Sequence, residues 1–170
     1  SYARDLYLGK QYLILKEPKY AMRHLLQAWS EMEDLAEHCN DLPTDFDEDC
    51  MDAWLVLGNA AVEAEDYDTG FKFFKKCADA NNAIGNNNLG WLYLRRDSCE
   101  ENYRKAIACF EKAAHCPDAP NVKANCHLGK MYLGKHPYAL DFAETDPEKA
   151  LYYLKRAKDL GATDVDQLIM

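Results

Sequence analysis

The chain has little positive charge and no long apolar run, and each absence removes a class of function. Its 170 residues carry 20 Lys and Arg against 29 Asp and Glu, a formal net charge of −9. Surfaces that bind nucleic acid or an anionic membrane need the opposite balance, so neither is the expected partner. The longest uncharged stretch, residues 80–94, contains five Asn and cannot span a bilayer.

Catalytic and metal-binding motifs are also missing. The sequence contains no His-Glu-x-x-His, no Gly-x-Ser-x-Gly, no Walker loop and no Cys-x-x-Cys. A metal site would have to start from the neighbouring Cys and His residues at 115–116 and 126–127. Neighbouring side chains on a helix point about 100° apart, which does not suit one metal. We therefore expect no enzymatic activity, no catalytic residues, no metal site and no cofactor.

The cysteines lack the even number that a secreted disulfide framework usually shows. They are seven and irregularly spaced, at Cys39, Cys50, Cys77, Cys99, Cys109, Cys116 and Cys126. This favours a reducing, cytoplasmic compartment. The chain begins at Ser1 rather than Met, so we expect a fragment or a processed product, and the lack of a leader does not bear on the parent protein.

The sequence does contain an internal repeat. Leu-Gly pairs recur at residues 8–9, 57–58, 89–90 and 128–129. In all but the second pair, a Tyr stands three residues after the glycine. Each pair precedes two small residues seven apart, with a large apolar residue four after the first. These triplets are Ala21, Leu25 and Ala28; Gly70, Phe74 and Cys77; Ala106, Phe110 and Ala113; and Ala150, Leu154 and Ala157. Such spacing puts both small residues on one helix stripe, where a second helix approaches closely.

The glycines and the boundary residues indicate helix hairpins. A glycine inside a helix costs about 1 kcal/mol relative to Ala, so its recurrence at one register implies a gain, which we expect to be close contact between the two helices of each hairpin. Asp146 and Pro147 are typical of a helix start, Ser98 and Glu101 have the capping-box spacing, and Gly161 stands where a helix should stop. We predict an all-α, right-handed α-solenoid of about four antiparallel helix hairpins.

The repeats should form a single domain over residues 1–170. They are expected over about 2–40, 51–80, 83–116 and 122–161, followed by a C-terminal capping segment over 162–170. The acidic residues between 41 and 49 are expected to form a solvated loop and helix start, since carboxylates are favourable at the positive end of a helix dipole.

These motifs resemble the tetratricopeptide (TPR) superfamily and its relative, the Sel-one-like repeat, over almost the whole chain. The interval from the Tyr position to the first small residue of the second helix is nine residues in the first two repeats, which is the tetratricopeptide spacing. It is thirteen in the third repeat, the Sel-one-like spacing, and longer in the fourth because five residues are inserted ahead of Asp146. The resemblance implies a hybrid array that binds peptides in a concave groove lined by the first helix of each hairpin.

The Leu-Gly register predicts which residues face that groove. The residue after each glycine should lie on the inner face, and so should polar residues one turn away. From this set we predict the following partner contacts, with Trp91 as the apolar anchor: Asn59, Asn88, Trp91, Arg95, Lys123, His127 and Lys130.

The resemblance also suggests a chemical group for the partner. Some tetratricopeptide domains hold a partner's C-terminal carboxylate with two Asn and several cationic side chains. Asn59, Asn88 and Lys123 fall on matching positions, whereas Leu55 and His127 stand where Lys and Arg are expected. A protein or peptide held through its C-terminal carboxylate is therefore one candidate partner, and ordinary polar contacts with some other protein are the alternative.

The predicted function is a non-enzymatic protein–protein interaction scaffold or adaptor. Two alternatives stay open. One is the docking region of a larger enzyme or complex subunit. The other is a secreted or organellar protein with thiol or disulfide chemistry, in which Cys116 and Cys126 would pair across a turn, as some secreted Sel-one-like proteins link neighbouring helices.

Overall fold

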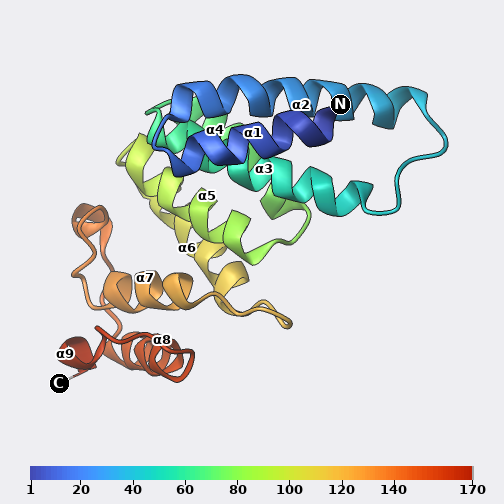
Figure 1. The fold of residues 1–170 in the computed structure, drawn as a ribbon. Helices are drawn as coiled ribbons and strands as arrows, with labels where there is room; N and C mark the ends of the chain where they lie inside the picture. Colours follow the sequence, from blue (N-terminus) through green and yellow to red (C-terminus); the bar gives the residue numbers. More distant parts are fainter. Residues whose placement is uncertain (170) are drawn as a thin grey trace. The chain divides into compact units, whose positions relative to one another are not determined.

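A computed structural model describes residues 1–169 and shows only helices, turns and loops in this range. The helices are α1 (Tyr2–Ile14), α2 (Pro18–His38), α3 (Phe46–Glu63), α4 (Tyr67–Asp79), α5 (Ala83–Arg96), α6 (Glu100–Ala114), α7 (Val122–Tyr132), α8 (Pro147–Asp159) and α9 (Asp166–Ile169), with a short 3-10 helix at Leu140–Phe142 (Figure 1). The predicted all-α class and the hairpins α1–α2, α3–α4, α5–α6 and α7–α8 are confirmed.

The chain divides into two compact units, Ser1–Cys77 and Ala78–Met170, which we call unit 1 and unit 2. Unit 1 has a core formed by α1, α2, α3 and α4, with Trp29 and Leu57 among its buried residues. Unit 2 has a core formed by α5 to α8, with Phe110 and Leu128 at its centre. That the two fold as the predicted single domain stays a prediction.

Each hairpin closes where a glycine of its first helix meets the large residue of its second helix. The four pairs are Gly9 with Leu25, Gly58 with Phe74, Gly90 with Phe110, and Gly129 with Leu154. A Cβ atom on any of these glycines would lie 2.9 Å or less from a side-chain carbon of its partner. Ordinary carbon contacts are about 3.5–4.0 Å, so only glycine permits this approach. The expected gain from the helical glycines is confirmed.

The start of α6 differs from the prediction. Its N-cap is Cys99 rather than Ser98, because the thiol sulfur of Cys99 accepts the backbone N–H of Asn102 at 3.5 Å. The helix therefore begins one residue later than the capping-box spacing indicated. At α8 the prediction is confirmed, since the carboxylate of Asp146 accepts the backbone N–H of Lys149 at 3.2 Å.

The C-terminal segment packs on the last hairpin. Val165 is buried with Leu154 and Ala157 of α8, and Leu168 is partly buried against the same cluster. Of the predicted capping segment 162–170, Met170 lies outside the described residues.

Five of the described helices are followed by a turn with one residue in the left-handed region. These residues are Lys16, Glu65, Asn81, Gly134 and Gly161. In α3 the N–H of Glu65 donates to the carbonyl of Val62 at 3.0 Å, and the next N–H, of Asp66, donates to Ala61 at 2.8 Å. This pattern is the Schellman motif, which favours glycine at the left-handed position. The predicted end of α8 at Gly161 is confirmed.

We expect Glu65→Gly to raise the free energy of unfolding by roughly 0.5–1 kcal/mol. Glu65 is exposed and has a φ of 62°, so glycine removes strain that exceeds its entropic cost. Urea denaturation at neutral pH measures the change. The matched control is Glu63→Gly, which puts glycine at the last residue of α3 and should lower the same free energy by up to about 1 kcal/mol. A lower stability for Glu65→Gly would contradict the prediction.

Candidate functional site

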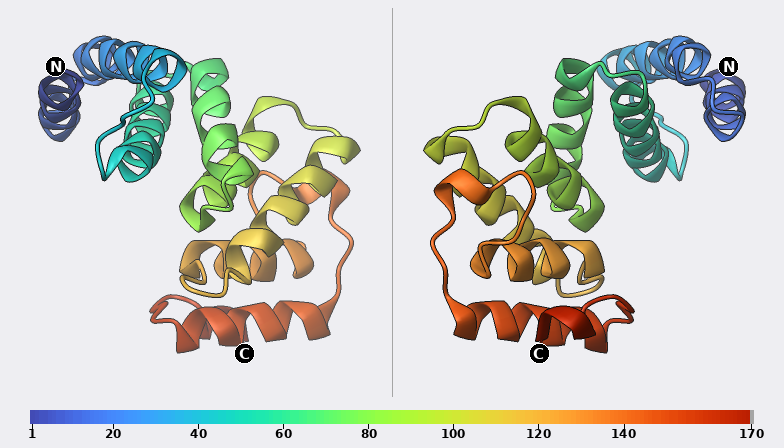
Figure 2. Two further views of the ribbon diagram at one scale, coloured as in Figure 1. Left: turned by 90° about the vertical axis from the view of Figure 1, so that its right-hand side faces the viewer. Right: turned by 90° about the vertical axis from the view of Figure 1, so that its left-hand side faces the viewer.

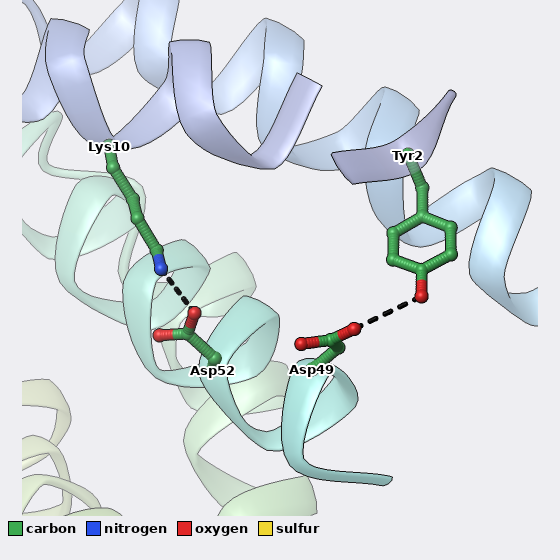
Figure 3. A network of polar contacts seen from close by, with 4 residues as sticks. All are labelled: Tyr2, Lys10, Asp49 and Asp52. Atoms are coloured by element: carbon green, nitrogen blue, oxygen red, sulfur yellow. Dashed lines mark hydrogen bonds and ion pairs between the residues drawn. The ribbon is translucent and has the colours of Figure 1, made fainter. Parts of the chain in front are cut away.

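In unit 1 the residue after the first Leu-Gly pair, Lys10, is paired with a carboxylate of the next repeat. Lys10 of α1 forms an ion pair with Asp52 of α3, and the hydroxyl of Tyr2 donates to Asp49 at 3.0 Å (Figure 3). Both contacts join the first helices of the first two repeats. Because Asp52 neutralises it, Lys10 adds no unpaired positive charge to this face.

Unit 2 contains six of the seven predicted contact residues. They lie on its two first helices, with Asn88, Trp91 and Arg95 on α5 and Lys123, His127 and Lys130 on α7. The seventh residue, Asn59, is exposed on α3 of unit 1. That all seven residues line one groove stays a prediction.

Arg95 lies against two aromatic rings. Its guanidinium carbon is 5.4 Å from the ring centroid of Trp91, one turn earlier on α5. The same carbon is 4.4 Å from the ring centroid of Tyr138, which belongs to the long connection between α7 and α8. Both distances are within the range of about 6 Å for a cation–π interaction. Tyr138 therefore joins Trp91 and Arg95 on the predicted surface, although Tyr138 itself was not predicted.

His127 contacts a second residue of the same connection, His136. Nδ1 of His127 lies 2.9 Å from Nε2 of His136, and the backbone N–H of Tyr138 donates to Nδ1 of His136 at 3.2 Å. Since that Nδ1 accepts, the hydrogen-bond pattern assigns the proton of the neutral ring to Nε2, which donates to His127. The ring of His127 also stacks on Phe110, with centroids 4.6 Å apart.

Both histidines are neutral at physiological pH. Burial lowers the pKa of His127 to about 3, helped by His136 and by the positive charges of Lys130 and Lys123. Burial also lowers the pKa of His136 to about 4, again with help from Lys130. His127, at the position where the resemblance implies Arg, therefore supplies hydrogen-bonding nitrogen atoms rather than a positive charge.

The positive charge of this face comes from Arg95, Lys123 and Lys130. Lys123 is exposed and Lys130 is half-buried, and both act on the pKa of His127 from the same helix. None of the three forms an ion pair with any residue in the described range. Asn88, half-buried on α5, accepts a hydrogen bond from the side chain of Asn87 at 3.3 Å.

A buried asparagine on α7 has a structural role that the sequence analysis missed. Asn125 is fully buried, and its side-chain nitrogen donates to the carbonyl of Asn121 at 2.8 Å. Its oxygen accepts Nε of Arg156 at 3.2 Å, and the same guanidinium donates to the carbonyl of Ala114 at 2.8 Å. These bonds tie α8 to α7 and to the end of α6. Asn125 stands four residues after the N-cap Asn121, just as Asn86 stands four residues after the N-cap Asn82. This repeated spacing is visible in the sequence and could have indicated the role of Asn125.

The cysteines are unpaired in the structure, and two of the buried ones have raised pKa values. All seven cysteines are free, so the alternative pairing of Cys116 with Cys126 is not formed. Burial raises the pKa of Cys77 to about 12, and burial with two neighbouring aspartates raises that of Cys50 to about 11. Both thiols are therefore protonated at neutral pH.

Among residues 1–169 no three His, Cys, Asp or Glu side chains are grouped so that they could hold a metal ion. Within the same residues no helix has the length and apolar character needed to cross a membrane.

Comparison with protein families identifies the repeat. The family model described as Sel1 repeat matches residues 56–82, 83–118 and 122–161, which is more than half of the chain. The chain belongs to the Sel1 repeat family. The match includes the second repeat, to which the nine-residue interval had assigned tetratricopeptide spacing, and leaves only the first repeat outside. No curated protein matches the sequence.

The family agrees with an interaction role. Sel1 repeats form a TPR-like helical repeat family and are commonly protein–protein interaction modules, which supports a scaffold or adaptor role and a protein partner. The family is typically non-catalytic.

Proposed function

We propose that this Sel1 repeat chain is a non-enzymatic scaffold that binds a peptide or helix of a partner protein on the faces of α5 and α7 in unit 2. One observation carries the proposal: a continuous row of side chains links the two helices. Trp91 contacts Arg95, Arg95 contacts Tyr138, and the connection that holds Tyr138 contacts His127 through His136. The row joins aromatic surface, unpaired cations and hydrogen-bonding groups, which interaction hot spots combine.

Each predicted residue of unit 2 has a role in this proposal. Trp91 is the apolar anchor, and the cations Arg95, Lys123 and Lys130 attract a negatively charged group of the partner. Such a group, for instance a C-terminal carboxylate, would form charge-assisted hydrogen bonds here. His127 and Asn88 act as neutral hydrogen-bonding groups.

Position-specific photocrosslinking in native lysate tests the surface. Benzoylphenylalanine at Asn88 or Lys123 should crosslink a partner, whereas the exposed positions Ala108 and Lys155, on the second helices α6 and α8, serve as matched controls without crosslinks. Trp91→Ala in the Lys123 reporter should reduce the crosslink at least about tenfold, the loss of a strong anchor residue. Circular dichroism confirms the fold of each variant. Crosslinks confined to Ala108 and Lys155, or unaffected by Trp91→Ala, would contradict the proposal.

A further inference from the structure

Two arginines of unit 2 lie over tyrosine rings, but only one of them has its N–H groups occupied. The guanidinium carbon of Arg156 is 5.7 Å from the ring centroid of Tyr152. Its N–H groups donate to the side chain of Asn125 and to the carbonyl of Ala114. Arg156 therefore serves the packing of α8 against its neighbours.

Arg95 is different. It is exposed, it lies over both Trp91 and Tyr138, and within residues 1–169 it forms no hydrogen bond or ion pair. The guanidinium is planar, so contact with rings uses its face and leaves the N–H edges for hydrogen bonds. The two rings also restrict the side chain before a ligand arrives, which reduces the entropic cost of binding.

The connection between α7 and α8 holds Tyr138 in place. The residues on either side of the turn, His136 and Ala139, are 3% and 2% exposed, and the N–H of Ala139 donates to the carbonyl of His136 at 3.1 Å. Phe142 packs against the core of unit 2, and Figure 2 shows the connection running along one side of this unit. Tyr138 is 43% exposed, so an anchored backbone presents its side chain at the surface beside Arg95.

The unpaired charges on the first helices of unit 2 are positive and favour an acidic ligand. Lys123 and Lys130 add two unpaired cations on α7, although the chain as a whole has a net charge of −9. A C-terminus supplies one carboxylate, whereas an acidic segment supplies several carboxylates for the three cations. The planar N–H edge of a guanidinium matches the two oxygens of one carboxylate.

We propose that Arg95 is the receptor for a side-chain carboxylate of an acidic peptide segment, and that Tyr138 is the residue that positions it. The connection between α7 and α8 is thereby part of the interaction surface. This inference rests on the proposed function and specifies the chemistry of the partner segment.

The test uses a blocked hexaglutamate, N-acetylated and C-amidated, added to the full ¹⁵N-labelled chain at low salt. Saturable binding should shift the side-chain Nε–Hε resonance of Arg95. Arg95→Gln and Arg95→Lys should each weaken binding about tenfold or more, because Lys keeps the charge but lacks the bidentate edge. Tyr138→Ala should weaken it about threefold to fivefold, while Tyr138→Phe, which keeps the ring, retains the affinity.

The matched control is Tyr152→Ala, which removes the tyrosine over the occupied Arg156 and should leave peptide affinity unchanged. An unshifted Arg95 resonance, or equal affinity in Arg95→Gln, would overturn the inference. Tighter binding and a larger Arg95 shift with an N-acetylated neutral pentapeptide that has a free C-terminus would also overturn it, in favour of a terminal carboxylate. If the crosslinks at Asn88 and Lys123 persist in these cases, the proposed function stands and only the acidic-segment inference fails.

Discussion

Phe110→Ala is expected to lower the free energy of unfolding by about 3–5 kcal/mol, the cost of removing a fully buried phenylalanine. Phe110 is 0% exposed and fills the space beside Gly90 in the third hairpin. Its ring also stacks on His127, so the substitution leaves a cavity that both α5 and α7 border. Urea denaturation followed by circular dichroism measures the loss.

Gly90 and Phe110 can be tested together in a double-mutant cycle. Gly90→Ala should lower the stability of the wild-type chain by about 1–3 kcal/mol, because the new Cβ would lie 2.9 Å from the ring of Phe110. In the Phe110→Ala background the ring is absent, and Gly90→Ala should instead raise stability by up to about 1 kcal/mol through helix propensity. Additive effects of the two substitutions would show that the glycine is not retained for this contact.

This coupling explains why so much of the fold was predictable. A glycine inside a helix lowers helix stability, so it recurs only where it is needed. Its pairing with a large residue of the next helix produces a regular spacing in the sequence. Gly90 with Phe110 and Gly129 with Leu154 each encode a local hairpin contact. Where the local signal was weaker the prediction slipped by a residue, as at the N-cap Cys99.

The candidate site was predictable only where it lies on helices. Trp91 and Arg95 share a face because they are one turn apart, and their contact through a cation–π interaction follows from that spacing. His136 and Tyr138 lie in a connection with no helical period. Which of its residues return to α5 and α7 depends on how the connection packs, and that is a tertiary property. The sequence indicated an insertion between α7 and α8. It did not indicate that this insertion supplies part of the proposed binding surface.

A change of pH is expected to have the second large effect on the free energy of unfolding, through the pair His127 and His136. In the folded chain their pKa values are lowered to about 3 and about 4, against an ordinary value near 6.5. The unfolded chain therefore binds protons more tightly than the folded chain. The stabilisation is fully present above pH 6.5, and it is lost as the pH falls below 6.5 toward the folded-state values.

We expect the free energy of unfolding to fall by about 4 kcal/mol between pH 7 and pH 5 because of this pair, about 2 kcal/mol from each ring. Urea denaturation at several pH values measures the wild type and His136→Gln, whose amide can still donate to Nδ1 of His127. All carboxylates and the other histidines are common to both proteins, so the difference in their pH dependence isolates the substituted ring. The variant should lose about half of the pair's effect, and identical pH dependence would contradict the assignment of two neutral, buried imidazoles. The backbone N–H of Tyr138 donates to Nδ1 of His136, and protonation of His136 removes this hydrogen bond. Acid should therefore broaden the Arg95 side-chain resonance before the helices unfold.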